Sequence, residues 1–268
     1  MYFCKMRVAL FPFLLFLSTA FCHAQIRVEK LVIPAGESYP LIGSDILVAD
    51  TLIMENASRI VLNRNKTDNF IHAKVIQVGT DCAIVGHGAN GADGEKGLAG
   101  YTATGPCKDG IPGRPGKNGT NGTDGVNLFI YFGQLTIAGK LSFELSGGNG
   151  GDGGKGGNGG GGSPGTRLCP GGNGGAGGDG GDGGNAGNGG TLTLTCNGCG
   201  SLRAWMGNKI QVRAYGGNAG LGGEGGLGGL AGLVSAGRTS QDGNQGPKGK
   251  EGAGGNPGKN GAIDFEEN

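Results

Sequence analysis

The stretch that decides the fold of this chain is Gly147-Gly148-Asn149-Gly150-Gly151-Asp152-Gly153-Gly154-Lys155-Gly156-Gly157-Asn158. The same pattern resumes as Gly171-Gly172-Asn173-Gly174-Gly175-Ala176, after a break over residues 163–170. A flexible linker has no reason to keep two glycines in every triplet in phase. The strict period of three therefore predicts ordered structure in a segment whose composition alone resembles a linker.

A period of three is typical of the polyproline-II conformation, which has three residues per turn and no internal hydrogen bonds. Its backbone groups point outward and need partners when buried. Glycine allows a neighbouring backbone to come close, so two glycines per triplet leave two sides free for neighbours. The third position carries the outward side chain, which we expect to be polar and solvated. These residues are Asn149, Asp152, Lys155, Asn158, Asn173, Asp179 and Asp182.

The glycine period recurs in two further excursions of the chain. The first runs out over 88–100 and back over 110–125, and the third runs out over 216–233 and back over 243–261. We predict three hairpins, hence six antiparallel polyglycine-II helices, each about 40–60 Å long at ~3.1 Å per residue. The second hairpin and 216–233 should be inner, 110–125 and 243–261 outer, and 88–100 intermediate.

Between the excursions the sequence is rich in Val and Ile, which predicts β-strands. The predicted strands are 26–33, 46–54, 59–62, 70–78, 82–85, 126–132, 135–138, 141–145, 191–195, 201–205, 209–215 and 262–266. The fold class is therefore mainly β plus polyglycine-II, with a short β-solenoid or a sandwich as the core. The expected organisation is a signal peptide (1–24), a β region (25–87), a glycine-rich region (88–261) containing β blocks 126–146 and 191–215, and a closing strand and tail (262–268).

The N-terminal segment reads as a secretory signal. Lys5 and Arg7 precede the apolar run 8–17, and Cys22-His23-Ala24 offers small residues at the −3 and −1 positions before cleavage. The apolar run is too short to span a bilayer. We expect an exported protein that is secreted or lies at the cell surface, with no membrane span.

Five cysteines follow this segment, and an oxidising compartment makes disulfides the default state. Cys107 and Cys169 both fall in turns where an arm reverses, so we predict a disulfide between them. Cys196 and Cys199 form a CxxC that either closes a local turn or leaves one member to pair with Cys82. The odd number leaves one cysteine unpaired or available for an intermolecular disulfide.

Composition excludes several function classes. A formal net charge of +1 gives no basic footprint for nucleic acid. The run 174–182 imitates a calcium-binding nonapeptide, but Gly181 stands where that motif needs a large apolar residue. His72 and His87 have no arranged nucleophile or carboxylate pair, and we expect them to be structural. The sequence predicts no enzyme, no metal and no cofactor.

One apolar stripe lies in the third outgoing arm. Leu221, Leu227, Leu230 and Leu233 share one phase of the triplet. They either pack on the return arm or the core, or form an exposed contact face for a partner.

The arms 147–165 and 171–190 resemble two families of packed polyglycine-II proteins. One is the springtail antifreeze protein, and the other comprises the receptor-binding adhesins of bacteriophage tail fibres. The arms with one glycine per triplet also resemble collagen-like Gly-X-Y repeats. The likeness covers about residues 88–261, is architectural, and transfers no individual residue.

We therefore expect an exported, non-catalytic structural or adhesive protein that presents loops on a rigid bundle to a surface or matrix ligand, a glycan or a protein. The candidate binding residues lie in the distal turns 101–109, 163–170 and 234–242, since loops carry function on rigid scaffolds. They are Tyr101, Lys108, Arg167, Leu168, Arg238 and Gln241. The alternatives are an antifreeze protein with a flat face of small residues and a β-helix carbohydrate-active protein with clustered carboxylates.

Overall fold

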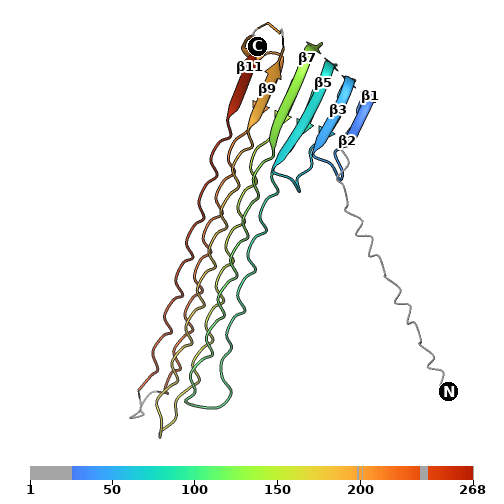
Figure 1. Cartoon of the computed structure of the whole chain (residues 1–268). Helices are drawn as coiled ribbons and strands as arrows, with labels where there is room; N and C mark the ends of the chain where they lie inside the picture. Colours follow the sequence, from blue (N-terminus) through green and yellow to red (C-terminus); the bar gives the residue numbers. More distant parts are fainter. Residues whose placement is uncertain (1–25, 198, 201, 236–240, 268) are drawn as a thin grey trace, which may run out of the picture.

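A computed structural model describes residues 26–197, 199–200, 202–235 and 241–267. The described chain forms two parallel sheets (Figure 1). The first sheet contains β1 (Ile26–Ile33), β3 (Ile46–Met54), β5 (Asp68–Val78), β7 (Asn127–Ile137), β9 (Leu192–Cys196) and β11 (Ile263–Glu267). The second contains β2 (Ser38–Pro40), β4 (Arg59–Val61), β6 (Cys82–Val85), β8 (Leu141–Glu144) and β10 (Ile210–Arg213). The predicted signal peptide 1–24 lies outside the described residues.

Successive strands alternate between the two sheets, so each pair of strands makes one rung and the rungs stack in chain order. Every strand pair is parallel, for example Ile71 beside Leu47 and Ile130. The mainly β class is confirmed, and the parallel pairing is compatible with the predicted solenoid. It does not fit a sandwich of antiparallel hairpins, since parallel neighbours need long connections.

Three of the predicted strands need correction. Residues 202–205 are a 3-10 helix, η1 (Leu202–Trp205), instead of a strand. The runs 126–132 and 135–138 are one continuous strand, β7, because Gly133 and Gln134 remain extended between them. The sequence prediction also missed β2, whose three residues pair with β4 through Tyr39 and Ile60.

The core lies between the two sheets. Strand side chains alternate between the two faces, and the inward set is apolar. Leu47, Leu128 and Leu192 from the first sheet and Ile60 and Ile210 from the second are fully buried. Parallel pairing places equivalent inward residues in rows from rung to rung, so the β region buries one continuous core.

The glycine-rich arms leave this core at one corner. The first two rungs are joined to the next by short loops, 41–45 and 62–67. In the next three rungs the same connection, from the second sheet back to the first, is replaced by 86–126, 145–191 and 214–262. We name the outgoing and return arms of these excursions 1a (87–100), 1b (110–125), 2a (147–162), 2b (171–190), 3a (216–233) and 3b (243–261). Figure 1 shows them running side by side away from the sheets.

Backbone hydrogen bonds recur at every third residue between the arms. In arm 1a, Gly91 and Gly94 donate to the carbonyls of Asn149 and Asp152 in arm 2a, at 2.7 Å each. The pattern continues from the sheets, where Gly86 donates to Glu144. Neighbouring parallel strands are about 4.8 Å apart, so the rungs deliver successive arms at a spacing that backbone hydrogen bonds can bridge.

The number of arms to which each arm is hydrogen-bonded tests the predicted inner and outer positions, and it agrees with them only in part. Arms 2a and 2b each bond to four other arms, as expected for the inner hairpin. Arm 3b bonds only to 2b and 3a, which fits an outer position. Arm 1a, however, has only two neighbours, while 1b has three. Their predicted order is wrong because rung order, as well as glycine content, places an arm in the stack.

Candidate functional site

The turns 101–109 and 163–170 and the described ends of the third turn, 234–235 and 241–242, come together at the end of the arms that is far from the sheets (Figure 1). Backbone N–H groups join them directly. Cys107 donates to Pro164 at 2.9 Å, Gly165 to Leu233 at 3.1 Å, and Gly171 to Gln241 at 2.9 Å. The hydroxyl of Ser163, itself buried, donates to the carbonyl of Ala103 at 2.6 Å. The turns therefore form one connected surface.

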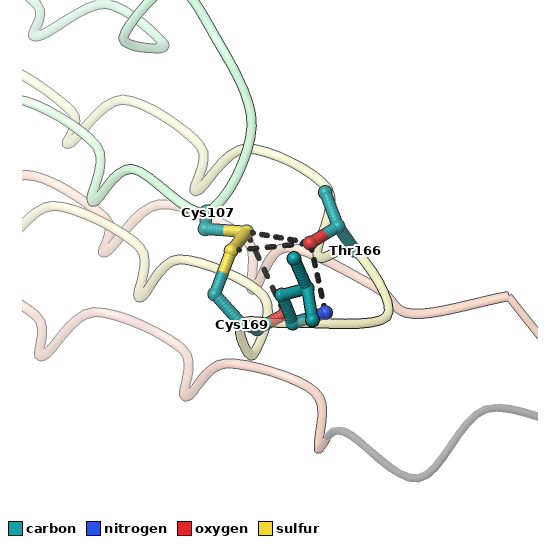
Figure 2. Close-up of a disulfide and its surroundings, with 4 residues drawn as sticks. Cys107, Thr166 and Cys169 are labelled. Carbon is teal, nitrogen blue, oxygen red and sulfur yellow. Dashed lines mark hydrogen bonds between the residues drawn. A yellow bond between two sulfur atoms is a disulfide. The ribbon is translucent and has the colours of Figure 1, made fainter.

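A disulfide between Cys107 and Cys169 fastens the first two turns, with a Cα–Cα distance of 6.0 Å. This confirms the predicted pairing. Figure 2 shows Thr166 beside the two sulfur atoms. The Oγ1 atom of Thr166 lies 3.3 Å from Sγ of Cys169 and accepts a hydrogen bond from the N–H of Leu168 at 3.2 Å. The loop that carries Leu168 is thus fixed by Thr166 on one side of Leu168 and by the disulfide at Cys169 on the other.

Five of the six predicted binding residues can be placed, and all five are exposed at this end. Leu168 is 97% exposed and Tyr101 is 69% exposed. Lys108, Arg167 and Gln241 are exposed as well. Arg238 lies outside the described residues. The structure gathers these side chains on neighbouring turns.

The third-position Asn and Asp side chains have a role that the sequence analysis missed. They are exposed, as predicted, but they also accept hydrogen bonds from outward backbone N–H groups of the next arm. Asn149 donates its N–H to Oδ1 of Asn90, and Oδ1 of Asn149 accepts from Asn218, at 2.9 and 2.8 Å. The further acceptors are Asp93, Asp109, Asn118, Asn121, Asp124, Asp152, Asn158, Asn173, Asp179, Asp182, Asn185 and Asn188. Asn127, half-buried at the start of β7, accepts from the N–H of Thr191 in the same way.

These side chains follow a fixed spacing in sequence that could have revealed them. Donor and acceptor are 59 residues apart between arms 1a and 2a, and 69 apart between 2a and 3a. In the return arms the separations are 64 and 71 residues. Aligning the arms at these offsets brings Asn and Asp into rows, and short acceptor side chains satisfy nearby backbone donors well.

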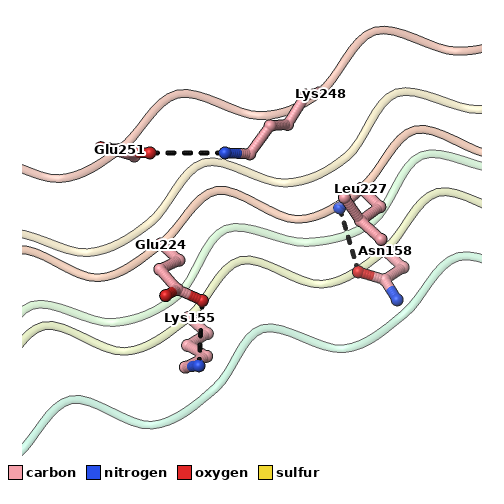
Figure 3. Close-up of polar contacts among 6 residues, drawn as sticks. All are labelled: Lys155, Asn158, Glu224, Leu227, Lys248 and Glu251. Carbon is pink, nitrogen blue, oxygen red and sulfur yellow. Dashed lines mark hydrogen bonds and ion pairs between the residues drawn. The ribbon is translucent and has the colours of Figure 1, made fainter.

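The leucine stripe is exposed, which decides between the two alternatives against packing on the core or the return arm. Leu221, Leu227, Leu230 and Leu233 are 70%, 62%, 75% and 67% exposed. Among the described residues, no further arm lies beside arm 3a to offer an N–H to a third-position acceptor there. Figure 3 shows that Leu227 donates its N–H to Oδ1 of Asn158 in arm 2a, at 3.0 Å. The leucine occupies the third position of arm 3a without being an acceptor itself.

The second disulfide joins Cys196 and Cys199, which confirms the local-turn alternative for the CxxC. Cys82 is the free cysteine among those described, and it is 1% exposed. Its thiol donates to the carbonyl of Glu55 at 3.0 Å. Burial keeps this thiol from a cysteine of another molecule, which argues against an intermolecular disulfide through it.

The described residues also lack the features of a metal centre and of a membrane-spanning helix. They contain no group of three or more His, Cys, Asp or Glu side chains arranged to hold a metal ion. In the same part of the chain, no helix has the length and apolar character needed to cross a bilayer. The two intramolecular disulfides are typical of an oxidising extracellular environment.

Comparison with known proteins gives no relative: no family model, no curated protein and no solved structure matches this chain.

Proposed function

We propose that the six arms form a polyglycine-II bundle that acts as a rigid support. The supporting observation is the regular series of backbone hydrogen bonds among arms that are neither helix nor strand. A Cβ atom on Gly151 or Gly178 would overlap the carbonyl oxygen of Ala92 or Arg114. Such close backbone approach favours glycine on the facing sides of each arm.

On this support, the protein is an exported, non-catalytic structural or adhesive protein that contacts a surface or matrix ligand through its distal turns. The observation that carries this proposal is the gathering of exposed Tyr101, Arg167 and Leu168 on turns fastened by a disulfide. A fully exposed leucine beside an arginine on a fixed loop has no role in packing. Pre-organised loops lose little entropy when they bind. Secretion through the N-terminal segment is part of the proposal.

The test is a pair of substitutions at the tip. Immobilised protein is presented to arrays of glycans and of matrix proteins. Arg167→Ser with Leu168→Ser should abolish the binding seen with the natural chain, while Arg64→Ser, an exposed arginine of the β region, should leave it unchanged. Circular dichroism of both variants controls for folding. Binding that survives the tip variant would contradict the proposal.

An ice-binding function is a second candidate, because the return arms present a regular face. Side chains such as Asn121, Asn185 and Asn256 line up across three arms. The Oδ1 atoms of Asn121 and Asn185 are engaged by backbone N–H groups, however, and Asp179 and Lys250 interrupt the face with charge. Adhesion is therefore the better-supported function. Thermal hysteresis in concentrated protein would favour ice binding instead.

A further inference from the structure

The outer face of the first sheet carries aromatic side chains in its middle strands, β5 and β7. The rings of Phe70 and Phe129 are stacked, with centroids 5.1 Å apart. Two residues further along the same strands, the rings of His72 and Tyr131 have centroids 6.1 Å apart. Both pairs are in direct register across the two strands, and paired aromatic rings attract each other. The ring of Tyr131 is thus supported from β5 while the residue stays 37% exposed.

A hollow of about 290 Å³ lies beside these rings because β7 carries a glycine. Its lining includes His72, Lys74, Tyr131, Gly133, Thr195 and Asn197. In the two preceding rungs, the positions equivalent to Gly133 hold Asp50 and Lys74, which form an ion pair at 2.9 Å. A Cβ on Gly133 would have one neighbouring atom within 4 Å, the carbonyl oxygen of Lys74 at 3.1 Å. The missing side chain therefore leaves open space between Lys74 and Asn197.

The side of the hollow that faces β9 is fixed by the short disulfide. Asn197 lies inside the loop closed by Cys196 and Cys199, whose Cα atoms are 5.8 Å apart. Its N–H donates to the carbonyl of Phe132 in β7 at 3.2 Å, which ties the loop to the floor of the hollow. Among the described residues, the side-chain amide of Asn197 has no hydrogen-bond partner. So short a loop adds little to stability by restricting the unfolded chain, but it holds a free amide in place.

The chemistry of this hollow fits a ring that has an apolar face and a polar rim. The main chain of β5 and β7 is already hydrogen-bonded between strands, so side chains must recognise the ligand. The amide of Asn197 offers donors and an acceptor, and the ammonium of Lys74 has donors beyond the one used by Asp50. An apolar ligand would leave these groups without partners, which is unfavourable. A pyranose ring can pack its C–H face on Tyr131 while its hydroxyl groups bind at the rim.

We propose that this hollow binds one pyranose ring of a glycan, with Tyr131 packed on the ring and Asn197 and Lys74 hydrogen-bonded to its hydroxyl groups. Its volume lies just below the ~300–1,000 Å³ of typical small-molecule sites, which suits a single sugar ring. The site belongs to the β region and is separate from the distal turns, which lie at the far end of the arms. It depends neither on the polyglycine-II bundle nor on binding by those turns.

The test is saturation-transfer NMR on the intact protein with the methyl glycosides of glucose, galactose, mannose and N-acetylglucosamine, each added alone. We expect transfer to the ring C–H protons of at least one sugar, with shifts of the Tyr131 and Asn197 amide signals on titration. Tyr131→Leu should weaken binding by about tenfold, whereas Tyr131→Phe keeps the ring and should retain most of it. Asn197→Ala should weaken binding by about tenfold, as expected for two hydrogen bonds. Cys196→Ser/Cys199→Ser should also weaken it, because the amide is released.

The matched control is Gln134→Ala, an exposed residue of the same strand outside the hollow, which should leave binding unchanged. The tip variant Arg167→Ser/Leu168→Ser should leave it unchanged as well, which separates this site from the distal turns. The amide spectrum of each variant controls for folding. Absence of transfer from all four sugars, or transfer that Tyr131→Leu does not reduce, would overturn the proposal. Binding of a deglycosylated matrix protein that Tyr131→Leu abolishes, with no sugar bound, would assign the hollow to a polypeptide and overturn it too.

Discussion

At the residue scale, the choice of Asn and Asp at third positions has a physical cause. In arms 2a and 2b a third-position N–H points out of the stack, and without a partner it would depend on water. An Asn or Asp side chain of the preceding arm accepts a hydrogen bond from this N–H through its Oδ1 atom, at 2.6–3.0 Å in every bond of this kind. The side chain on one arm thus satisfies a backbone donor of the next arm.

Removing one such acceptor gives the first prediction. Asn149→Ala removes the oxygen that accepts from the N–H of Asn218. We expect a loss of about 0.5–1 kcal/mol in the free energy of unfolding, the net worth of one hydrogen bond, with faster hydrogen exchange at Asn218. Asn149→Asp keeps Oδ1 and is the matched control. Equal exchange rates at Asn218 in both variants would reject this role for the side chain.

Two exposed ion pairs predict a small pH dependence. Lys117 lowers the pKa of Glu95, and Lys155 lowers the pKa of Glu224, first through a hydrogen bond and then through charge. A lowered carboxyl pKa in the folded state adds stability above the ordinary glutamate pKa of about 4.3. That stability is lost as the pH falls through the lowered value. Lys117→Met removes this effect at Glu95, so the melting temperature should fall less steeply as the pH is lowered. An unchanged dependence of the melting temperature on pH would contradict the assignment.

At the element scale, the side that an arm turns to its neighbours decides which glycines are required. A Cβ on Gly178 in arm 2b would overlap the carbonyl oxygen of Arg114, whereas a Cβ on Gly254 in arm 3b has Gly220 O as its nearest atom, at 3.7 Å. Arm 3b also carries Gln245, Lys248, Glu251 and Pro257 in that row, where arm 2b has mostly glycine. Large and charged residues of this kind blunt the exposed edges of sheets.

This contrast predicts opposite outcomes for the same substitution. Gly178→Ala should destabilise the protein by about 1–3 kcal/mol, because the backbone must move to admit the methyl group. Gly254→Ala should be neutral or stabilising by up to about 1 kcal/mol, since it only restricts the unfolded chain. Thermal unfolding of the two variants measures the difference. Similar losses at both positions would mean that the row of Gly254 is packed as closely as the row of Gly178.

At the scale of the whole molecule, the β rungs and the arms support each other. Ordering a glycine costs about 1–2 kcal/mol of backbone entropy, and one backbone hydrogen bond returns about 0.5–1.5 kcal/mol net. An arm is therefore not expected to be stable on its own. The rungs fix one end of each arm, and the Cys107–Cys169 disulfide fixes the far end of the first two hairpins.

The two disulfides should differ in their contribution to stability. Cys107 and Cys169 are 62 residues apart, while Cys196 and Cys199 are three apart. A longer closed loop restricts the unfolded chain more. Replacing Cys107 and Cys169 by serine should cost about 2–4 kcal/mol, and the same change at Cys196 and Cys199 should cost less. Chemical denaturation measures both, and a larger loss for the short loop would contradict the anchoring role.

Local sequence was sufficient for much of this architecture. The alternation of Val and Ile predicted β1, β3, β5 and β6, since apolar periodicity depends on neighbours in the chain. The position of Cys107 and Cys169 in the reversal turns predicted their disulfide. The candidate binding turns followed from the same reversal points. The 3-10 helix at Leu202–Trp205 was missed because its buried Leu202 and half-buried Trp205 resemble a strand pattern.

The sequence by itself determined the triplet period, the strand-rich blocks and the turns where each arm reverses, because these depend on residues close together in the chain. Only the tertiary structure decided which arms are neighbours, that Asn149 serves Asn218, and that Leu227 and Leu230 face solvent. Those outcomes depend on the order of rungs, which brings residues 59 to 71 positions apart into contact. The physical reason is that the arms have no internal hydrogen bonds, so each arm's partners are set by the neighbours that the stacked β-strands deliver.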